Sequence, residues 1–188
     1  MKKLFFLLLT IVLTTIGCNE TSENPVQREE TPDAKQELLD KIASLEASVM
    51  DENGRIDRSE GNQLLRAYIN FTNQYHEDDM RCDYTVQAAK LAQGLERYTQ
   101  AIELYTNVYQ GCLTHKLNVE SLFMIAVIHH NFLNDRETAK KHYEDFIEHH
   151  ADHPLAADAQ SMLDMLYMTD DQIIEKFKKN NADSDLPS

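Results

Sequence analysis

The chain has 188 residues, of which 42% are hydrophobic and 27% are charged, and its formal net charge is −14 at pH 7. Such an acidic protein is expected to repel nucleic acids and anionic membrane head groups, which excludes nucleic-acid binding as its function. The length suits a single domain, and five glycines, four prolines and no tryptophan indicate an all-α fold and not a turn-rich β fold.

The chain begins with a short apolar run, Leu4 to Ile16, which follows two lysines. A helix rises about 1.5 Å per residue, so a run of this length falls well short of a hydrocarbon core about 30 Å thick. A basic start, a short apolar stretch and small residues at its end are typical of a secretory signal peptide. Residues 1–17 are therefore predicted to be a signal peptide, with an uncleaved anchor as the alternative.

This segment ends in Thr15-Ile16-Gly17-Cys18, which resembles the lipobox of bacterial lipoproteins. The resemblance implies cleavage before Cys18 and lipidation of its thiol, and the several acyl chains of a bacterial lipoprotein would hold the protein firmly on a membrane. Asn19 is not the Asp that signals inner-membrane retention in enterobacterial lipoproteins. The expected location is therefore the bacterial cell envelope, on the outer membrane facing the periplasm, with plain secretion as the alternative.

After Cys18 the chain is polar as far as Pro32, and Val26 is its only sizeable apolar residue there. Such a segment cannot bury enough apolar surface to offset the entropy lost on ordering. Residues 18–32 are predicted to be a flexible tether. A coil of about 14 residues reaches on the order of 20 Å, enough to hold a domain away from the head groups.

A folded helical domain is predicted over residues 33–180. Its first helix carries an apolar stripe with spacings of four, three and four residues, formed by Leu38, Ile42, Leu45 and Val49. Asn53-Gly54 then interrupts the pattern, as a helix C-cap would. A second apolar pattern follows, with Asp57 or Ser59 as its N-cap, so the two helices are predicted to form a hairpin.

Further helices are predicted at residues 83–94, 97–111, 118–132, 135–150, 154–167 and 170–179, followed by a disordered tail over residues 181–188. Three segments of this series align, 66–75, 100–109 and 138–147. In each of them an alanine is followed four residues later by an aromatic residue, in the pairs Ala67 and Phe71, Ala101 and Tyr105, and Ala139 and Tyr143. The first two alanines are 34 residues apart.

This pattern resembles the second helix of the tetratricopeptide repeat (TPR), whose period is 34 residues. Tyr98 also falls where that family commonly carries an aromatic residue. The segment HPLAADAQSMLDML resembles the proline-started first helix of TPR lipoproteins of the outer-membrane assembly (BamD-like) and Tol-Pal-associated types. The resemblance covers about residues 57–168 and implies a TPR-like superhelix of antiparallel helical hairpins. A plain helical bundle is the alternative, and it differs because hairpins of a solenoid contact only their neighbours.

Two cysteines, Cys82 and Cys112, flank the central predicted hairpin. Antiparallel helices of similar length bring these two positions together, and an oxidising envelope compartment favours disulfides. We expect a disulfide that closes a loop of roughly 30 residues and stabilises the fold by about 3 kcal/mol in the chain-entropy model. The alternative is a pair of unbonded cysteines that pack as small apolar side chains.

Two motifs raise the alternative of a calcium- or metal-responsive binding protein. Residues 49–60 match the EF-hand calcium loop at several positions, although Val49 stands where the first Asp ligand belongs, and a capped helix-turn-helix is the competing interpretation. A histidine cluster has zinc-binding chemistry, but histidines at a helix C-terminus also meet a favourable dipole. Its members are His129, His130, His142, His149, His150 and His153. We predict neither a metal nor a cofactor.

The sequence contains no nucleophile elbow, phosphate loop or zinc-protease motif, so we expect no enzyme. We expect a lipid-anchored scaffold that binds an envelope protein or peptide, possibly basic in view of the net charge, within an outer-membrane assembly or transport complex. The TPR resemblance implies that first helices line the concave binding face. They nominate Gln87, Lys90, Leu91, Gln93, Asn118, Ser121, Leu122 and Ile125. Tyr84 and Tyr109 are candidate anchors because aromatic residues dominate binding hot spots, and packing between helices is the alternative for both. The oligomeric state is left open.

Overall fold

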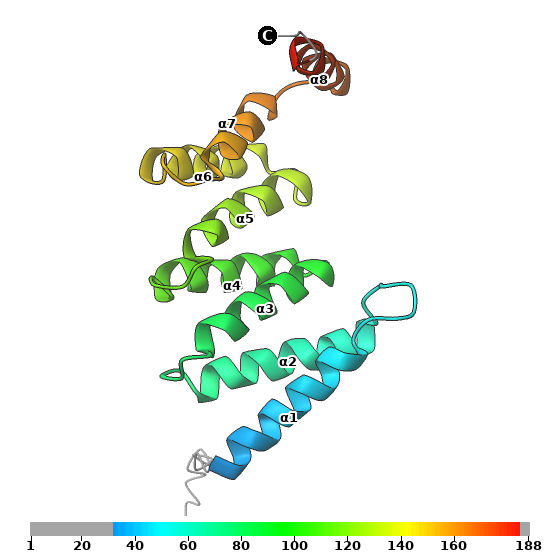
Figure 1. Ribbon diagram of the computed structural model, residues 1–188, viewed down its shortest axis with the longest axis vertical. Helices are drawn as coiled ribbons and strands as arrows, with labels where there is room; N and C mark the ends of the chain where they lie inside the picture. The colour runs from blue at the N-terminus through cyan, green and yellow to red at the C-terminus, as the bar shows by residue number, and fades with distance from the viewer. Residues whose placement is uncertain (1–31, 185–188) are drawn as a thin grey trace, which may run out of the picture.

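The computed structural model describes residues 32–184, and within that range it contains eight helices (Figure 1). The predicted signal peptide 1–17, Cys18 and nearly all of the predicted tether lie outside the described residues. The helices are α1 (Pro32–Ser48), α2 (Arg58–Gln74), α3 (Arg81–Gly94), α4 (Tyr98–Gly111), α5 (Asn118–Asn131), α6 (Arg136–His149), α7 (Ala156–Met165) and α8 (Asp170–Ser184).

Helices that follow one another in the sequence pack against one another, from α1 to α7. Figure 1 shows the hairpins α1–α2, α3–α4 and α5–α6 stacked along the long axis, with the first helix of each hairpin toward the viewer. A bundle would also place helices distant in sequence in extensive contact, and the helices of the described range do not do this. The predicted all-α fold, a TPR-like superhelix of helical hairpins, is confirmed.

The repeated alanine and aromatic pairs lie in the core of the solenoid. Ala101 and Ala139 have no exposed surface, and the rings of Phe71 and Tyr143 are also fully buried. A small residue lets the neighbouring helix approach closely, and an aromatic ring one turn later fills the groove beside it. Helix α3 packs between α2 and α4 in the same way, through three fully buried alanines, Ala88, Ala89 and Ala92.

The first hairpin turns through a short capped loop. Gly54 has a φ of 73°, in the left-handed region that favours glycine. Asp51 accepts hydrogen bonds from the amides of Asn53 and Arg55, both at 2.8 Å. Helix α2 then begins with Asp57 as its N-cap, whose side chain accepts from the Glu60 amide at 2.9 Å. Asp57 is therefore the cap that the sequence offered together with Ser59, which lies inside the first turn of α2.

The three turns that join one hairpin to the next share one hydrogen-bonding pattern. Each contains a residue whose side chain accepts a hydrogen bond from the amide two positions later, and these residues are Asp78, His115 and His153. The amide of each also donates to the carbonyl three residues earlier. The donors to the side chains are the residues directly before α3, α5 and α7, namely Met80 at 2.9 Å, Leu117 at 3.1 Å and Leu155 at 3.2 Å.

A disulfide joins Cys82, at the start of α3, to Cys112, directly after α4, with the two Cα atoms 5.8 Å apart. This is the pair that the sequence placed at the two ends of one hairpin. Arg81 strengthens the same junction, because its guanidinium donates to the Gly111 carbonyl oxygen at 2.8 Å. The α3–α4 hairpin is therefore closed covalently at the end from which the next turn departs.

Two predicted boundaries differ from the structure. Helix α1 already includes Pro32, which the sequence analysis had placed in the tether 18–32. Proline suits the first helical turn because that turn needs no donor at this position. Helix α8 runs to Ser184, so the predicted domain end at 180 and the tail beginning at 181 were set too early. Between Lys178 and Ser184 the chain has no glycine or proline that would end the helix.

Candidate functional site

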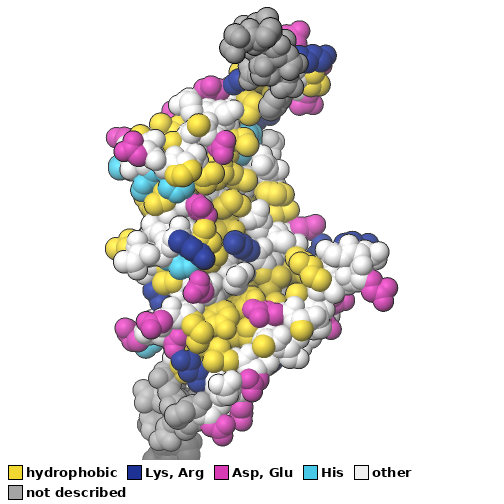
Figure 2. Space-filling view, in the orientation of Figure 1, with side chains coloured by type: hydrophobic (Ala, Val, Ile, Leu, Met, Phe, Trp, Pro, Cys, Tyr) yellow, Lys and Arg dark blue, Asp and Glu magenta, His cyan; other side chains and the backbone are white. Residues whose placement is uncertain are grey.

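The face formed by the first helices carries a hollow among the described residues. Figure 2 shows hydrophobic side chains gathered along the middle of this face, with charged side chains among them and further acidic side chains toward its edges. A groove of about 800 Å³ lies there between α3 and α4 on one side and α5 on the other. Leu117 and Leu155, which directly precede α5 and α7, also line it. A groove of this size can receive several side chains of a bound segment.

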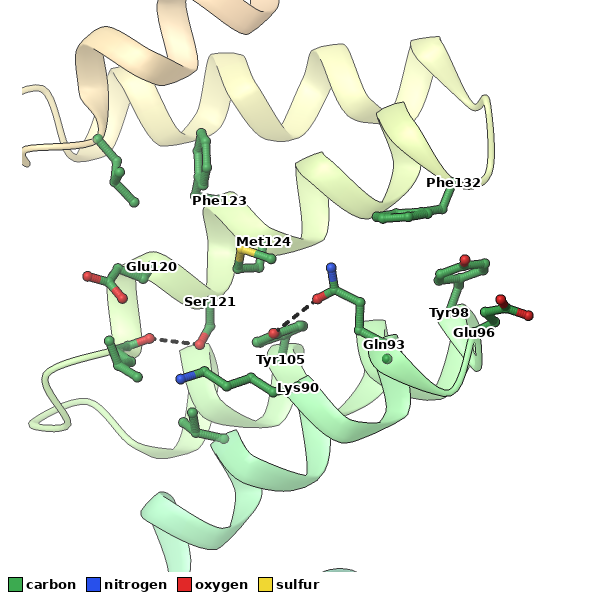
Figure 3. Close-up of a pocket in the computed structure, with 14 residues that line it drawn as sticks. Lys90, Gln93, Glu96, Tyr98, Tyr105, Glu120, Ser121, Phe123, Met124 and Phe132 are labelled. Carbon is green, nitrogen blue, oxygen red and sulfur yellow. Dashed lines mark hydrogen bonds between the residues drawn. The ribbon is translucent and has the colours of Figure 1, made fainter. Parts of the chain in front are cut away.

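Two polar side chains of α3 project into the groove one helical turn apart, Lys90 and Gln93 (Figure 3). The Tyr105 hydroxyl donates to the Gln93 Oε1 atom at 3.2 Å. Burial raises the pKa of Tyr105 to about 12, so its hydroxyl keeps its proton and remains a donor. This bond holds the amide oxygen toward Tyr105, and the amide nitrogen of Gln93 points into the groove as a donor for a bound carbonyl.

An aromatic stack closes one end of the groove. The rings of Tyr98 and Phe132 are 4.7 Å apart between centroids and 20° from parallel. Phe132 is 46% exposed, which is unusual for a phenylalanine. Neither residue was predicted from the sequence to bind a partner. The signal that would have revealed Phe132 is the apolar pair Phe132-Leu133, which interrupts an otherwise polar turn.

Helix α5 supplies the opposite wall. Phe123 packs edge-on against Phe146, with centroids 5.7 Å apart, so its ring is a fixed part of the wall. Met124 is half-buried and adds an adaptable apolar side chain. Ser121 is 1% exposed and donates to the Leu117 carbonyl at 2.7 Å. Its proton is therefore already used, and Glu120 is the charged group that α5 contributes.

The nominated residues divide between the groove and the core. Lys90, Gln93 and Ser121 line the groove. Leu122 and Ile125 are each only 3% exposed and belong to the hydrophobic core, so their assignment as partner-binding residues is wrong. They are buried because α5 packs against α4 on one side and α6 on the other.

Asn118 is a second correction. It is 8% exposed and donates through Nδ2 to the carbonyl oxygens of Val108 at 2.9 Å and Tyr109 at 2.6 Å. These bonds reach two carbonyl groups in the last turn of α4, where helical carbonyls have spare acceptor capacity, and the Val108 carbonyl also accepts from the Cys112 amide at 2.9 Å. Asn118 therefore joins α5 to α4 and has a structural role in place of the predicted binding role.

The other nominated residues lie outside the groove. Tyr84 is half-buried, with its ring 4.6 Å from Phe71 and 5.5 Å from Tyr68, which is the packing between helices that the sequence had left open. Gln87 is exposed on α3, and Leu91 is half-buried against the core. The geometry therefore concentrates the candidate site on the segment of α3 that holds Lys90 and Gln93.

The loop at residues 49–60 has the geometry of a capped turn. Val49, which occupies the first ligand position, is 7% exposed and belongs to the core. The Arg55 amide holds the pKa of Asp51 below its usual value, and Asp57 is used as the cap of α2. Within residues 32–184 these side chains form no group arranged to hold a metal ion, so the structure gives the calcium alternative no support. The apolar stripe of α1 requires Val49 inside, and a buried valine leaves the loop without its first ligand.

The histidines divide into separate contacts. His129 and His142 stack between α5 and α6, with ring centroids 5.7 Å apart, and His129 Nδ1 lies 3.3 Å from an Asp135 oxygen. His150 instead contacts Tyr109, whose hydroxyl lies 3.3 Å from Nε2. Among residues 32–184, no group of three or more His, Cys, Asp or Glu side chains is arranged to hold a metal ion. The metal alternative based on the histidines is therefore not supported by their geometry.

None of the described helices is long and apolar enough to cross a membrane. Comparison with protein families matches residues 47–185 to the family described as soluble NSF attachment protein, SNAP. No curated protein and no solved structure gives a significant match. The matched family differs from the BamD-like and Tol-Pal-associated lipoproteins that single segments resemble, and it shares with them the TPR-like helical repeat. The chain therefore belongs to the SNAP family, whose helical-repeat domains are protein-interaction scaffolds and are generally non-catalytic.

Proposed function

We propose that this chain is a lipid-anchored scaffold of the bacterial cell envelope that binds a segment of another protein in the groove between α3 and α5. The observation that carries the proposal is the groove itself, with its apolar walls and a donor held in position at Gln93. Apolar grooves with a few oriented polar groups are typical of binding sites. The name of the family describes attachment to another protein, and we carry over that general role.

The lining of the groove defines the segment that it would accept. The Tyr98–Phe132 stack offers a flat apolar surface for a large side chain, and Gln93 offers a donor to a backbone carbonyl. Lys90 and Glu120 carry opposite charges, and neither forms a salt bridge within the described residues. An apolar segment with charges flanking its anchor side chain fits these features. The net charge of −14 adds a long-range preference for a basic partner.

The anchor of the scaffold would be Cys18. The support for this part is the sequence, since Thr15-Ile16-Gly17-Cys18 resembles a lipobox and a polar tether follows. Acylation would hold the domain at the outer membrane on the periplasmic side. The resemblance to BamD-like and Tol-Pal-associated lipoproteins supports a place within an outer-membrane assembly or transport complex. We propose no catalytic activity.

The test is affinity purification of the full-length protein from its own crosslinked envelope, with co-purifying proteins identified by mass spectrometry. Three variants accompany the wild type. Phe132→Ala removes the exposed ring of the stack, Cys18→Ala removes the lipidation site, and Leu113→Ala truncates a residue that is 76% exposed and outside the groove.

We expect one envelope complex to co-purify with the wild type and with Leu113→Ala, and to be lost or strongly reduced with Phe132→Ala. The Cys18→Ala variant should lose it as well, because it no longer reaches the membrane. Equal recovery with Phe132→Ala and Leu113→Ala would contradict the groove as the binding site. Equal recovery with Cys18→Ala would contradict the lipid anchor while leaving the groove in place.

A further inference from the structure

Two groove-lining leucines have their backbone amides held by histidine rings. The Leu117 amide donates to His115 Nδ1 at 3.1 Å, and the Leu155 amide donates to His153 Nδ1 at 3.2 Å. Both leucines line the groove, and each lies directly before a first helix, α5 or α7. An imidazole nitrogen therefore helps to hold the backbone of each of these two lining residues.

Such a bond exists in only one protonation state. A ring nitrogen that accepts from an amide must carry a lone pair, and an imidazolium has none left because both nitrogens carry protons. An imidazole in ordinary surroundings is half-protonated at about pH 6.5 and about 90% protonated one unit lower. Protonation removes the acceptor and brings two N–H groups face to face. The leucine amide, at the start of a helix, then loses its partner.

The two histidines differ in what else holds them. His115 Nε2 lies 3.0 Å from an Asp83 oxygen, and the turn begins at Cys112, which the disulfide fixes. His153 Nε2 has no hydrogen-bond partner within residues 32–184, and its ring contacts the Phe146 ring at 5.5 Å between centroids. Among the described residues the Leu155 amide is therefore the hydrogen-bond partner that the His153 side chain has, and the α6–α7 turn is the less reinforced of the two.

The charged and titratable groups on the segments next to His153 come from three elements. Helix α6 contributes Asp145 and its last residue His149, the turn contributes His150 and Asp152, and the first turn of α7 contributes Asp158. Burial and the neighbouring His149 and His153 lower the pKa of His150.

We propose that the groove is proton-sensitive at its α7 end, where protonation of His153 releases the Leu155 amide, loosens the leucine that borders the groove and weakens binding of the partner segment. The binding part of this inference rests on the proposed function, whereas the release of the amide does not. The corresponding turn before α3 uses Asp78, a carboxylate that stays ionised and keeps its bond to the Met80 amide throughout the same pH range.

The decisive experiment is hydrogen–deuterium exchange of the acylated full-length protein in detergent, followed by mass spectrometry at pH 7.5 and 5.5. Rates are corrected for the intrinsic pH dependence of exchange. Protection at the Leu155 amide should fall by up to about tenfold at the lower pH, in proportion to the protonated fraction of the imidazole. Protection at Met80 should stay unchanged.

Two variants test whether the loss of protection at Leu155 depends on the His153 imidazole. His153→Asp copies the chemistry of the Asp78 turn, so protection at Leu155 should become independent of pH between 7.5 and 5.5. His76→Asn replaces an exposed histidine of the first turn and should behave as the wild type. The inference is overturned if protection at Leu155 is unchanged by acid in the wild type, or if it falls equally in His153→Asp.

The binding part is tested on the protein immobilised with its co-purified envelope partner, by a wash at pH 5.5. We expect the wash to release the partner from the wild type and to leave it on His153→Asp. Retention on both, with loss of protection at Leu155, would overturn the link between the turn and the groove. If no partner depends on Phe132 for binding, the proposed function is overturned, and the link between the turn and the groove with it. The exchange experiment would still decide whether acid releases the Leu155 amide.

Discussion

The turn before α3 and the turn before α7 have the same backbone hydrogen bonds but differ at the residue that holds them. Asp78 accepts from the Met80 amide and also pairs with Lys35 of α1, and the Lys35 contact is the main reason that its pKa lies below the usual value. His153 accepts from the Leu155 amide with a neutral ring nitrogen. One geometry can therefore be either permanent or conditional on pH, according to the side chain.

The turn before α5, which lies between these two, has a histidine acceptor like the turn before α7 and additional contacts like the turn before α3. His115 accepts like His153, but Asp83 and the Cys82–Cys112 disulfide reinforce it. Half-buried histidines also gather in the α5–α6 hairpin and in the turn that follows it. One stack of similar hairpins therefore has a turn before α3 whose side-chain hydrogen bond resists acid and a turn before α7 whose corresponding bond is sensitive to acid. The groove lies between these two turns.

The largest change we expect comes from Phe146→Ala. The ring has no exposed surface, and it contacts Phe123, His150 and His153, so it supports the whole α6–α7 end. Truncation of a buried phenylalanine costs about 3–5 kcal/mol in the free energy of unfolding. Urea unfolding measures it, with Leu113→Ala expected to stay within about 0.5 kcal/mol of the wild type. A loss no larger than that of the control would contradict the packing described for α6.

The next largest change should follow from removal of the disulfide by Cys82→Ser together with Cys112→Ser. The chain-entropy model gives a loss of about 3 kcal/mol for a loop of this length. Thermal unfolding of the double variant and of the wild type with and without reductant measures the loss. We also expect protection at the Leu117 amide to become as sensitive to acid as protection at Leu155. If Leu117 remained unaffected by acid, Asp83 alone would be enough to hold the second turn.

A smaller change is expected from Asp78→His, which gives the first turn the chemistry of the third. Loss of the carboxylate removes the contact with Lys35 and weakens the hydrogen bond from the Met80 amide. We expect the free energy of unfolding to fall by about 1 kcal/mol at neutral pH. The informative readout is exchange at the Met80 amide, which should become sensitive to acid between pH 7.5 and 5.5. Asp78→Asn is the matched control, since it keeps an uncharged acceptor and should remain insensitive to pH.

The smallest change we expect is a decrease in the free energy of unfolding at low pH, caused by the histidines inside the α5–α6 hairpin. Burial lowers the pKa of His130 and of His142, and the nearby Arg136 and His129 add to the effect at each. In acid the folded state therefore binds fewer protons than the unfolded state. The free energy of unfolding is at its full value above about pH 6.5, and part of it is lost as the pH falls toward the lowered pKa values of these histidines.

Urea midpoints measured at pH 7.5 and 5.5 test this effect. The wild type should show a lower midpoint at pH 5.5, and His142→Phe should show a smaller decrease because one buried titrating ring is gone. The contribution of Asp78, whose pKa lies below 3.8, is unaffected in this range. An equal decrease in both proteins would place the acid sensitivity elsewhere.

Most of the fold was predictable because its signals are local. Apolar residues with helical spacing predicted each helix, and the alanine and aromatic pairs predicted how neighbouring helices approach. Cys82 and Cys112 were paired correctly in position because the two ends of an antiparallel hairpin must meet. Asp57 was recognised as a cap because its short polar side chain precedes an apolar pattern.

The binding face was predicted less well, and α5 shows why. The sequence of this helix is apolar on nearly every side, from Leu122 to Ile128, so no polar stripe marks the face that remains open. Rotation of α5 about its axis is set by contacts with α4 and α6. These contacts bury Leu122 and Ile125 and leave Met124 in the groove.

The sequence by itself determined the helices, their hairpin order and the chemistry available at each turn, because these depend on residues within a few helical turns of one another. Only the tertiary structure decided the groove. It brings Tyr98 against Phe132 across two repeats, and it places the leucines held by His115 and His153 along one cavity. Residues so far apart in the chain meet only after the hairpins have stacked, and the angle of that stacking is a property of the whole core.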